Sequence, residues 1–141
     1  MHTRTCTGLG VLAMLFSLAG SVGAVQQCPK GLEPVTEFRM FFGLADGNGK
    51  VVTEDEWQRF LADTVTPRFR AGLTVFDGRG QWLPPSGELQ REPVKVVIGA
   101  LSSDPAKGIE LADEISVAFA KRFNQDPVFR MAAPTCAGLH P

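Results

Sequence analysis

Few residues in this chain belong to the types that catalyse reactions or bind metals. Its 141 residues include three cysteines, two histidines and no tyrosine. A serine or cysteine nucleophile needs a base within hydrogen-bonding reach, and His140 lies second from the end of the chain. No sequence typical of a hydrolase nucleophile elbow, a zinc protease or a phosphate-binding loop is present. The chemistry open to this chain therefore rests on carboxylates and arginines.

Cys28 and Cys136 lie just before and just after the segment with regular hydrophobic patterning. Their spacing is not the Cys-x-x-Cys spacing of redox and metal pairs. In an oxidising compartment such a pair forms a disulfide. We therefore expect a Cys28–Cys136 disulfide that joins the two ends of the folded body, and no metal site.

The segment 44–51 resembles part of a calcium-binding loop. When its second glycine is taken as the turn glycine, Asp46 and Asn48 fall at the third and fifth ligand positions. However, Leu44 stands at the first position and Asp55 at the last, so one carboxylate is missing and the other lacks bidentate reach. We interpret the segment as a turn in which glycines supply positive φ.

The first 24 residues have the three-part layout of a secretory signal peptide. A polar head precedes an uncharged run over residues 8–20, and small residues precede a cut after Ala24. This run is shorter than the about 20 residues that a membrane-spanning helix needs. A lipid anchor on Cys28 would want a small residue before it, and Gln27 stands there. We expect a periplasmic or secreted protein with neither a lipid anchor nor a membrane span after cleavage.

The charge balance excludes other classes of protein. The chain has 14 Lys+Arg against 15 Asp+Glu, so it lacks the basic excess of a nucleic-acid binder. It is 44% hydrophobic, which is too apolar for a disordered chain. We expect one folded domain with no nucleic-acid partner and no cofactor.

Hydrophobic periodicity predicts the order strand, helix, strand, strand, helix, strand between two tails, 25–35 and 134–141. Strands are predicted at 36–44, at 72–76 with a continuation through 81–82 after a bulge at 77–80, at 94–101 and at 128–133. The first helix begins at a Thr53/Glu56 capping box and ends at Pro67. The second runs from the N-cap Asp104 to about Phe123.

This order is typical of the ferredoxin-like βαββαβ fold. We therefore expect an α+β domain over residues 36–133, with a four-stranded antiparallel sheet and two helices on one face. The first and third strands should be central, and Trp57 on the first helix should lie in the core. The other face of the sheet would then be open to solvent, a ligand or a partner.

Alternation along the two central strands predicts what the open face carries. Phe38, Met40 and Phe42 are placed toward the helices, which leaves Glu37, Arg39 and Phe41 on the open face. On the other central strand, Val96 and Ile98 are placed inward, which leaves Lys95 and Val97 on the open face. The predicted ligand-binding residues are Arg39, Lys95, Phe41 and Phe76, with Phe129 nearby.

Three interpretations of this face remain open. A basic spot framed by aromatic rings would bind the carboxylate or phosphate of a small anionic ligand. Alternatively, the charges pair with Glu37 or Glu92 on a solvated face, or two sheets stack in a homodimer. We favour a non-enzymatic binding or interaction domain. The alternative is a small cofactor-free enzyme, with Arg39 as electrophile and Glu92 or Glu37 as acid and base.

Several short motifs also resemble a known family. They are Thr36-Glu37-Phe38-Arg39-Met40-Phe41-Phe42-Gly43-Leu44, Trp57-x-x-Phe60-Leu61, Thr66-Pro67-Arg68-Phe69, Gly72-Leu73-Thr74-Val75, Gly80-Gln81-Trp82 and Arg91-Glu92-Pro93-x-Lys95. The chain resembles, over about residues 36–131, the small exported bacterial proteins called domain of unknown function 3574. The resemblance implies an exported or lipid-anchored bacterial protein. It supplies no established activity and no catalytic residues.

Overall fold

The computed structural model describes residues 27–45, 49–100 and 104–138. The expected signal peptide and the two candidate calcium ligands, Asp46 and Asn48, lie outside these ranges. The elements in chain order are β1 (Glu33–Gly43), α1 (Glu54–Phe60), η1 (Leu61–Val65), η2 (Thr66–Arg68), β2 (Leu73–Trp82), β3 (Gln90–Ala100), α2 (Pro105–Phe123) and β4 (Phe129–Ala137). The turns η1 and η2 are π-helical and 3₁₀-helical continuations of α1.

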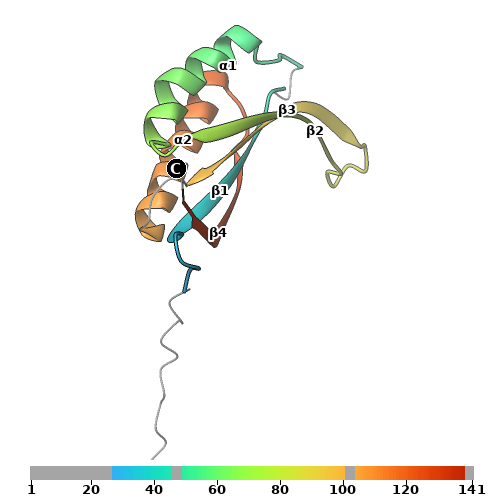
Figure 1. Cartoon of the computed structure of the whole chain (residues 1–141). Helices are drawn as coiled ribbons and strands as arrows, with labels where there is room; N and C mark the ends of the chain where they lie inside the picture. Colours follow the sequence, from blue (N-terminus) through green and yellow to red (C-terminus); the bar gives the residue numbers. More distant parts are fainter. Residues whose placement is uncertain (1–26, 46–48, 101–103, 139–141) are drawn as a thin grey trace, which may run out of the picture.

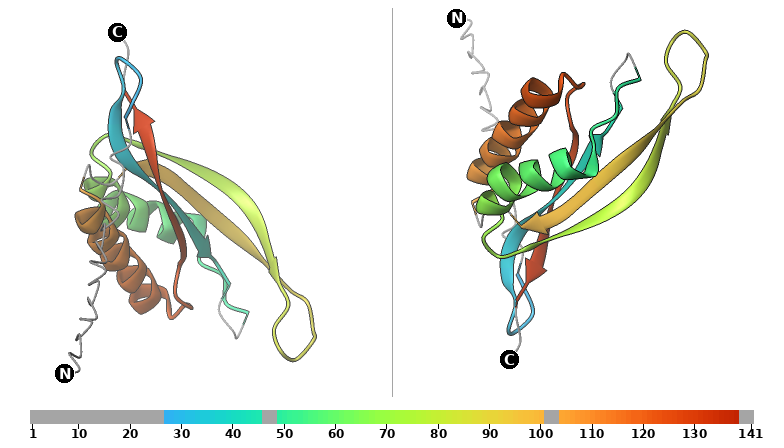
Figure 2. Two further views of the ribbon diagram at one scale, coloured as in Figure 1. Left: turned by 90° about the horizontal axis from the view of Figure 1, so that it is seen from below. Right: turned by 90° about the horizontal axis from the view of Figure 1, so that it is seen from above.

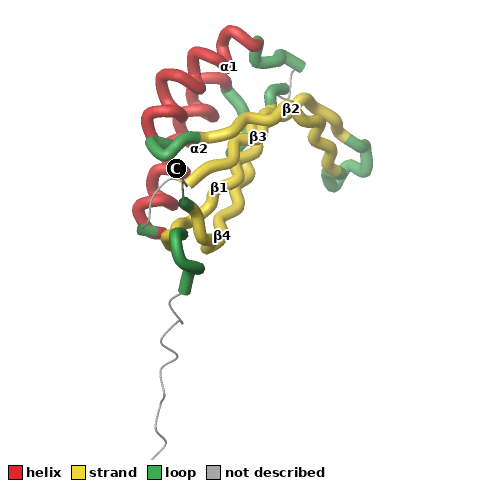
Figure 3. The backbone as a smooth tube through the Cα atoms, viewed as in Figure 1, coloured by secondary structure: helices red, strands yellow, loops and turns green. Residues whose placement is uncertain are grey.

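The four strands form one antiparallel sheet in the order β2-β3-β1-β4. Both helices cover the same face of this sheet, and the other face carries no helix (Figures 1 and 3). The strands β1 and β3 are central, as the ferredoxin-like order requires. The prediction of an α+β ferredoxin-like domain is therefore confirmed.

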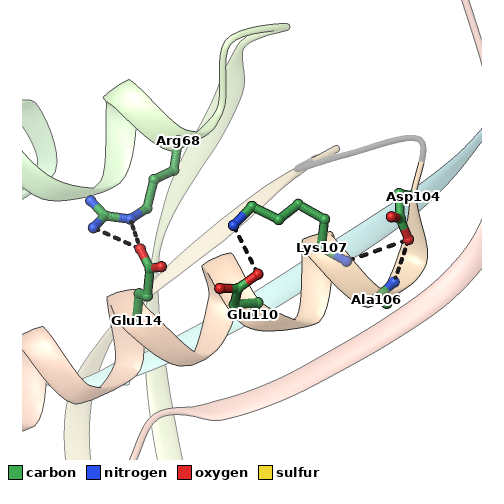
Figure 4. Close-up of polar contacts among 6 residues, drawn as sticks. All are labelled: Arg68, Asp104, Ala106, Lys107, Glu110 and Glu114. Carbon is green, nitrogen blue, oxygen red and sulfur yellow. Dashed lines mark hydrogen bonds and ion pairs between the residues drawn. The ribbon is translucent and has the colours of Figure 1, made fainter.

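Both helices begin where the sequence places their caps. The Thr53 hydroxyl accepts from the backbone N–H of Glu56, and the Glu56 carboxylate accepts from the Thr53 backbone N–H at 2.9 Å, which completes the capping box. At α2, Asp104 Oδ1 accepts from the backbone N–H of Ala106 at 2.9 Å (Figure 4). These bonds satisfy backbone donors that the first helical turn leaves unpaired.

An ion pair joins the two helical segments on the outside of the helix layer. The guanidinium of Arg68, in η2, lies 3.0 Å from Glu114 Oε2 on α2 (Figure 4). The same guanidinium donates to the Thr64 carbonyl at 2.6 Å. Arg68 thus connects the end of the first helical segment to the middle of the second.

The core lies between the helices and the inward face of the sheet. Phe42 of β1 is at its centre, with its ring centroid 5.1 Å from that of Trp57 and 5.0 Å from that of Phe119. The rings of Phe60 and Phe119 lie 5.4 Å apart, so α1 and α2 meet over this strand. All of these side chains are buried, and the prediction that Trp57 belongs to the core is confirmed.

The second and third strands are longer and more regular than their sequences predict. β2 pairs with β3 residue by residue from Leu73 to Trp82, so the predicted bulge at 77–80 is wrong. β3 begins at Gln90 and includes Pro93. The Pro93 carbonyl accepts a hydrogen bond from the Leu44 backbone N–H, so it points toward β1. In an antiparallel strand the N–H and C=O of one residue point to the same side, so the N–H that proline lacks would not bond to β2.

The expected disulfide is present between Cys28 and Cys136, with a Cα–Cα distance of 5.6 Å. Cys136 is the register partner of Pro34, at the end of the β1–β4 pairing, so the bond joins the segment before β1 to the last part of β4. The first described residues and the end of β4 lie together at one end of the molecule, and the β2–β3 hairpin loop lies at the other (Figure 2). This bond therefore closes the sheet at the end opposite the hairpin.

Candidate functional site

The β2–β3 hairpin extends past the helices and bends toward the open face of the sheet (Figures 1 and 2). The bend encloses a hollow of about 850 Å³, which is within the usual size range of small-molecule sites. Its walls come from the outer parts of all four strands and from the α2–β4 loop. Its lining includes Phe41, Trp82, Glu92, Val94, Asp126 and Phe129.

Two glycines allow side chains of β3 to lie flat against the backbone of neighbouring strands. A Cβ atom on Gly43 would lie 2.5 Å from Glu92 Oε2, and one on Gly80 would lie 2.8 Å from Val94 Cγ2. Both distances are shorter than real carbon contacts allow, so any larger residue would displace Glu92 or Val94. Gly43 therefore leaves the space that the Glu92 carboxylate occupies, and Gly80 does the same for Val94.

Glu92 provides the charged group in the wall of the hollow. It is half-buried, and the backbone N–H of Ala45 donates to its Oε2 at 3.4 Å. Asp126 adds a second carboxylate at the rim. Arg79 and Arg91 also line the hollow, but strand alternation directs their side chains to the opposite face of the hairpin. The concave side is thus acidic.

An apolar row crosses the sheet beside this carboxylate. Phe129, Phe41, Val96 and Phe76 are register partners on β4, β1, β3 and β2 in turn. The rings of Phe41 and Phe129 have centroids 5.5 Å apart. Phe76 is 53% exposed and Phe129 is 66% exposed, so their faces are available to a ligand.

Phe41 and Phe76, two of the predicted ligand-binding residues, therefore lie on the open face. Arg39 lies there too, but its Nε donates to Glu37 Oε1 at 2.5 Å, away from the hollow. Arg39 is paired with Ile98, which lies six residue steps along β3 from Glu92, or about 20 Å. The structure does not bring Arg39 and Glu92 together as the enzymatic interpretation requires.

The predicted orientation of β3 is wrong. Lys95 is the register partner of Phe42, and Val97 is the partner of Met40, so both face the helices. Val96 and Ile98 face outward instead. Lys95 is only 6% exposed, and it is buried because two carboxylates surround its ammonium. It therefore cannot form a basic spot with Arg39 on the open face.

The two carboxylates belong to α1 and β2. Lys95 Nζ lies 2.7 Å from Glu54 Oε2 and 2.5 Å from Asp77 Oδ1. Burial acts to lower the pKa of Lys95, but hydrogen bonds to Asp77 and Glu54 outweigh it, and the pKa is raised. The pKa of Glu54 is lowered, first by its hydrogen bond from Gln58 and then by Lys95. This cluster attaches the base of the hairpin to the start of α1.

Sequence reasoning missed several residues of the hollow, namely Trp82, Val94 and Asp126. One feature of the sequence could have indicated the hollow. Glycines at 43, 78 and 80 alternate with other residues on two strands. Such spacing leaves one strand face without side chains, where a neighbouring side chain or a ligand approaches the backbone.

Other kinds of site receive no support within the described ranges. No group of three or more His, Cys, Asp or Glu residues there is placed to hold a metal ion. None of the helices in the described part of the chain has the length and hydropathy of a membrane-spanning segment.

The structure is thus a small ferredoxin-like domain with an acidic, aromatic-lined hollow on its open sheet face. The chain belongs to the family described as protein of unknown function (DUF3574), whose model matches residues 37–139. This confirms the family that the sequence motifs resemble. A search of curated proteins found no match.

Among solved structures, the chain is similar to a phage SAM lyase in complex with S-methyl-5'-thioadenosine. The TM-score is 0.54 at 17% identity, over 81% of this chain and 95% of the lyase. The same lyase in its apo state matches with a TM-score of 0.54 at 16% identity, over 84% and 100% of the two chains. At this identity the likeness shows a shared fold.

Proposed function

We propose that this protein binds a small molecule in the hollow of its open sheet face, and that the ligand combines a flat apolar group with a positive charge. The observation that carries the proposal is the Glu92 carboxylate, held over Gly43 and beside the aromatic row. A carboxylate together with exposed aromatic faces attracts a cation by charge and by cation–π contact. The anionic ligand expected from the sequence does not suit a hollow with two carboxylates.

A nucleoside that carries a sulfonium or ammonium group meets both requirements. Its base would stack on Phe41 and Phe129, and its cation would lie near Glu92. The phage lyase that shares the fold is named for SAM, so S-adenosylmethionine, a sulfonium nucleoside, is a suitable first probe. S-adenosylhomocysteine is the matched neutral probe, because it is a thioether that differs from S-adenosylmethionine only in lacking the S-methyl group and the sulfonium charge.

Titration calorimetry of the purified protein with both probes tests this proposal. We expect the sulfonium compound to bind about tenfold more tightly than the neutral thioether, since one charge-assisted contact differs between them. Glu92→Gln should remove that preference and leave the thioether affinity unchanged. Glu37→Gln is the matched control, because it removes a carboxylate from the same face outside the hollow. No measurable binding of either probe, or an unchanged preference in Glu92→Gln, would refute the proposal.

A second candidate function is a small enzyme in which Glu92 accepts a proton from the bound ligand. The observation that favours it is the half-buried position of this one carboxylate within a site of ligand size. Mass spectrometry of S-adenosylmethionine incubated with the protein would detect turnover. Turnover that Glu92→Gln abolishes, while the sulfonium still binds, would assign this role. An intact ligand after prolonged incubation would leave the binding role alone.

We further propose that the protein works outside the cytoplasm. Residues 1–24 have the layout of a secretory signal, and the Cys28–Cys136 disulfide suits an oxidising compartment. The mass of the protein recovered from its producing cells tests this. Cleavage after Ala24 supports export with removal of the signal, whereas an intact N-terminus in reduced protein would contradict it.

A further inference from the structure

The outer edge of β2 is free for pairing with another strand. β2 has ten residues and, within the described part of the chain, pairs only with β3. Exposed edge strands usually contain a proline, a bulge or charged side chains that prevent pairing with another chain. The opposite edge strand, β4, contains Pro134, whereas β2 has no proline, an unbroken register and two charged residues of opposite sign, Asp77 and Arg79.

We propose that this edge binds a second copy of the same chain. The two β2 strands would pair antiparallel about a two-fold axis at Gly78, and the two sheets would join into one continuous sheet. The helices of both copies would then lie on the same face, and the open faces would form one surface. The proposal commits to this partner because the charges of β2 complement a second β2 in one register.

The register follows from the positions of Asp77 and Arg79. Directly opposed residues of an antiparallel pair share a sheet face, so the two-fold axis passes through a residue of β2. An axis through Asp77 or through Arg79 sets two like charges against each other. An axis through Gly78 sets Asp77 opposite Arg79 of the partner subunit, and this contact occurs twice. Opposite charges across strands stabilise a pair, and like charges destabilise it.

Both charged groups are accessible for this contact. The Asp77 side chain is 83% exposed even though it pairs with Lys95. Arg79 is exposed and forms no ion pair within the residues that the structure describes. Joining the edges would therefore give Arg79 a carboxylate partner without breaking an existing ion pair.

The same register places an aromatic ring over a glycine. Phe76 falls opposite Gly80 of the partner subunit, and an aromatic side chain facing a glycine covers exposed backbone. Because Gly80 lines the hollow, Phe76 of each copy would lie at the rim of the other copy's hollow. This part of the inference rests on the proposed ligand-binding function, whereas the pairing itself does not.

Disulfide cross-linking of the purified protein tests the position of the two-fold axis. Cys6, the cysteine outside the Cys28–Cys136 disulfide, is changed to serine so that it cannot form a cross-link. Gly78→Cys would be self-opposed, with the two Cα atoms about 5 Å apart, which suits a disulfide. A Cβ at this position meets nothing closer than 3.7 Å, so the variant should fold. Thr74→Cys is the matched control, because the two copies would be separated by eight residue steps, or about 27 Å. We expect covalent dimer from Gly78→Cys and not from Thr74→Cys, and equal yields from the two would overturn the proposal.

Sedimentation of the disulfide-intact protein with Arg79→Asp provides a second measurement. This change sets aspartates opposite each other, and we expect at least a tenfold rise in the dimer dissociation constant. Arg91→Asp, one strand away from the edge, is the control and should dimerise normally. Wild-type protein that sediments as a monomer at every concentration would refute the pairing. A dimer that fails to bind either nucleoside probe would refute the proposed function and leave the pairing intact.

Discussion

Lys95 allows a quantitative test of how burial and charge balance in this fold. Its side chain is 8% exposed, whereas those of Glu54 and Asp77 are 59% and 83% exposed. Lys95→Met keeps most of the packed volume and leaves two carboxylates that water can solvate. Ion pairs with solvent-exposed partners contribute little, so we expect the loss of Lys95 to lower the free energy of unfolding by about 1 kcal/mol.

The opposite perturbation should cost more. Glu54→Gln combined with Asp77→Asn leaves the Lys95 ammonium buried without a negative partner. An uncompensated charge in the interior typically destabilises a protein by about 3–5 kcal/mol. The amide oxygens of the two new side chains still accept hydrogen bonds from the Lys95 ammonium. We therefore expect the double variant to lower the free energy of unfolding by about 3 kcal/mol, at the lower end of that range. Removing the cation should thus be less harmful than removing both anions.

Urea unfolding at pH 7 with the disulfide intact measures this difference. Tryptophan fluorescence from Trp57 reports on the core, and an unchanged dependence on denaturant would show that the same surface unfolds in each variant. Lys107→Met is the control, because Lys107 pairs with Glu110 at 2.8 Å while half of its side chain is exposed, and we expect no measurable change. If Lys95→Met destabilised the protein more than the double variant, the argument from burial would be refuted.

Two further predictions concern the whole domain. Replacing both cysteines (Cys28→Ser with Cys136→Ser) should lower the free energy of unfolding by about 4–5 kcal/mol, because the bond constrains a loop of 108 residues in the unfolded chain. A thermal unfolding curve that reduction of the bond leaves unchanged would contradict this. Acid should destabilise the domain through Glu56, whose pKa is lowered from 4.5, first by the backbone hydrogen bond from Thr53. Its contribution is complete above about pH 4.5 and is lost as the pH falls through the lower folded value. Glu56→Gln should therefore reduce the slope of stability against pH below about pH 4.5 in urea titrations, and an unchanged slope would contradict the assignment.

The helices and the sheet order could be predicted because local signals agree with the tertiary structure. The capping box at Thr53 and the N-cap at Asp104 mark helix starts that need no long-range information. The alternation of β1 is also unambiguous, because its inward residues are buried and Arg39 on the outward side is exposed. Once these elements are placed, topology rules leave few arrangements.

Which side chains of β3 face the helices could not be predicted from its sequence. Val94, Val96, Val97 and Ile98 are apolar on both faces of a central strand, so alternation gives no direction. Lys95 is the one charged residue among them, and a lysine is normally exposed, which favours the wrong face. Its burial depends on Glu54 and Asp77, which are distant in the sequence.

The candidate site was predicted only in part for a similar reason. Phe41 and Phe76 could be assigned to the open face from alternation alone. The hollow itself depends on how far the hairpin bends and on the approach of Glu92 to Gly43, and both are tertiary features. Glycine spacing indicates where a strand face lacks side chains, but it does not predict which neighbouring side chain covers that face.

The position of the disulfide has a mechanical consequence. Cys28 and Cys136 enclose almost the whole described chain between them, and the outer ends of β1 and β4 lie side by side at the bond. Tension applied to residues 27 and 138 would pass from one cysteine to the other through the covalent bond. Neither the sheet nor the helices would carry that load, so stretching the chain by its ends would not unfold the domain until the bond was reduced.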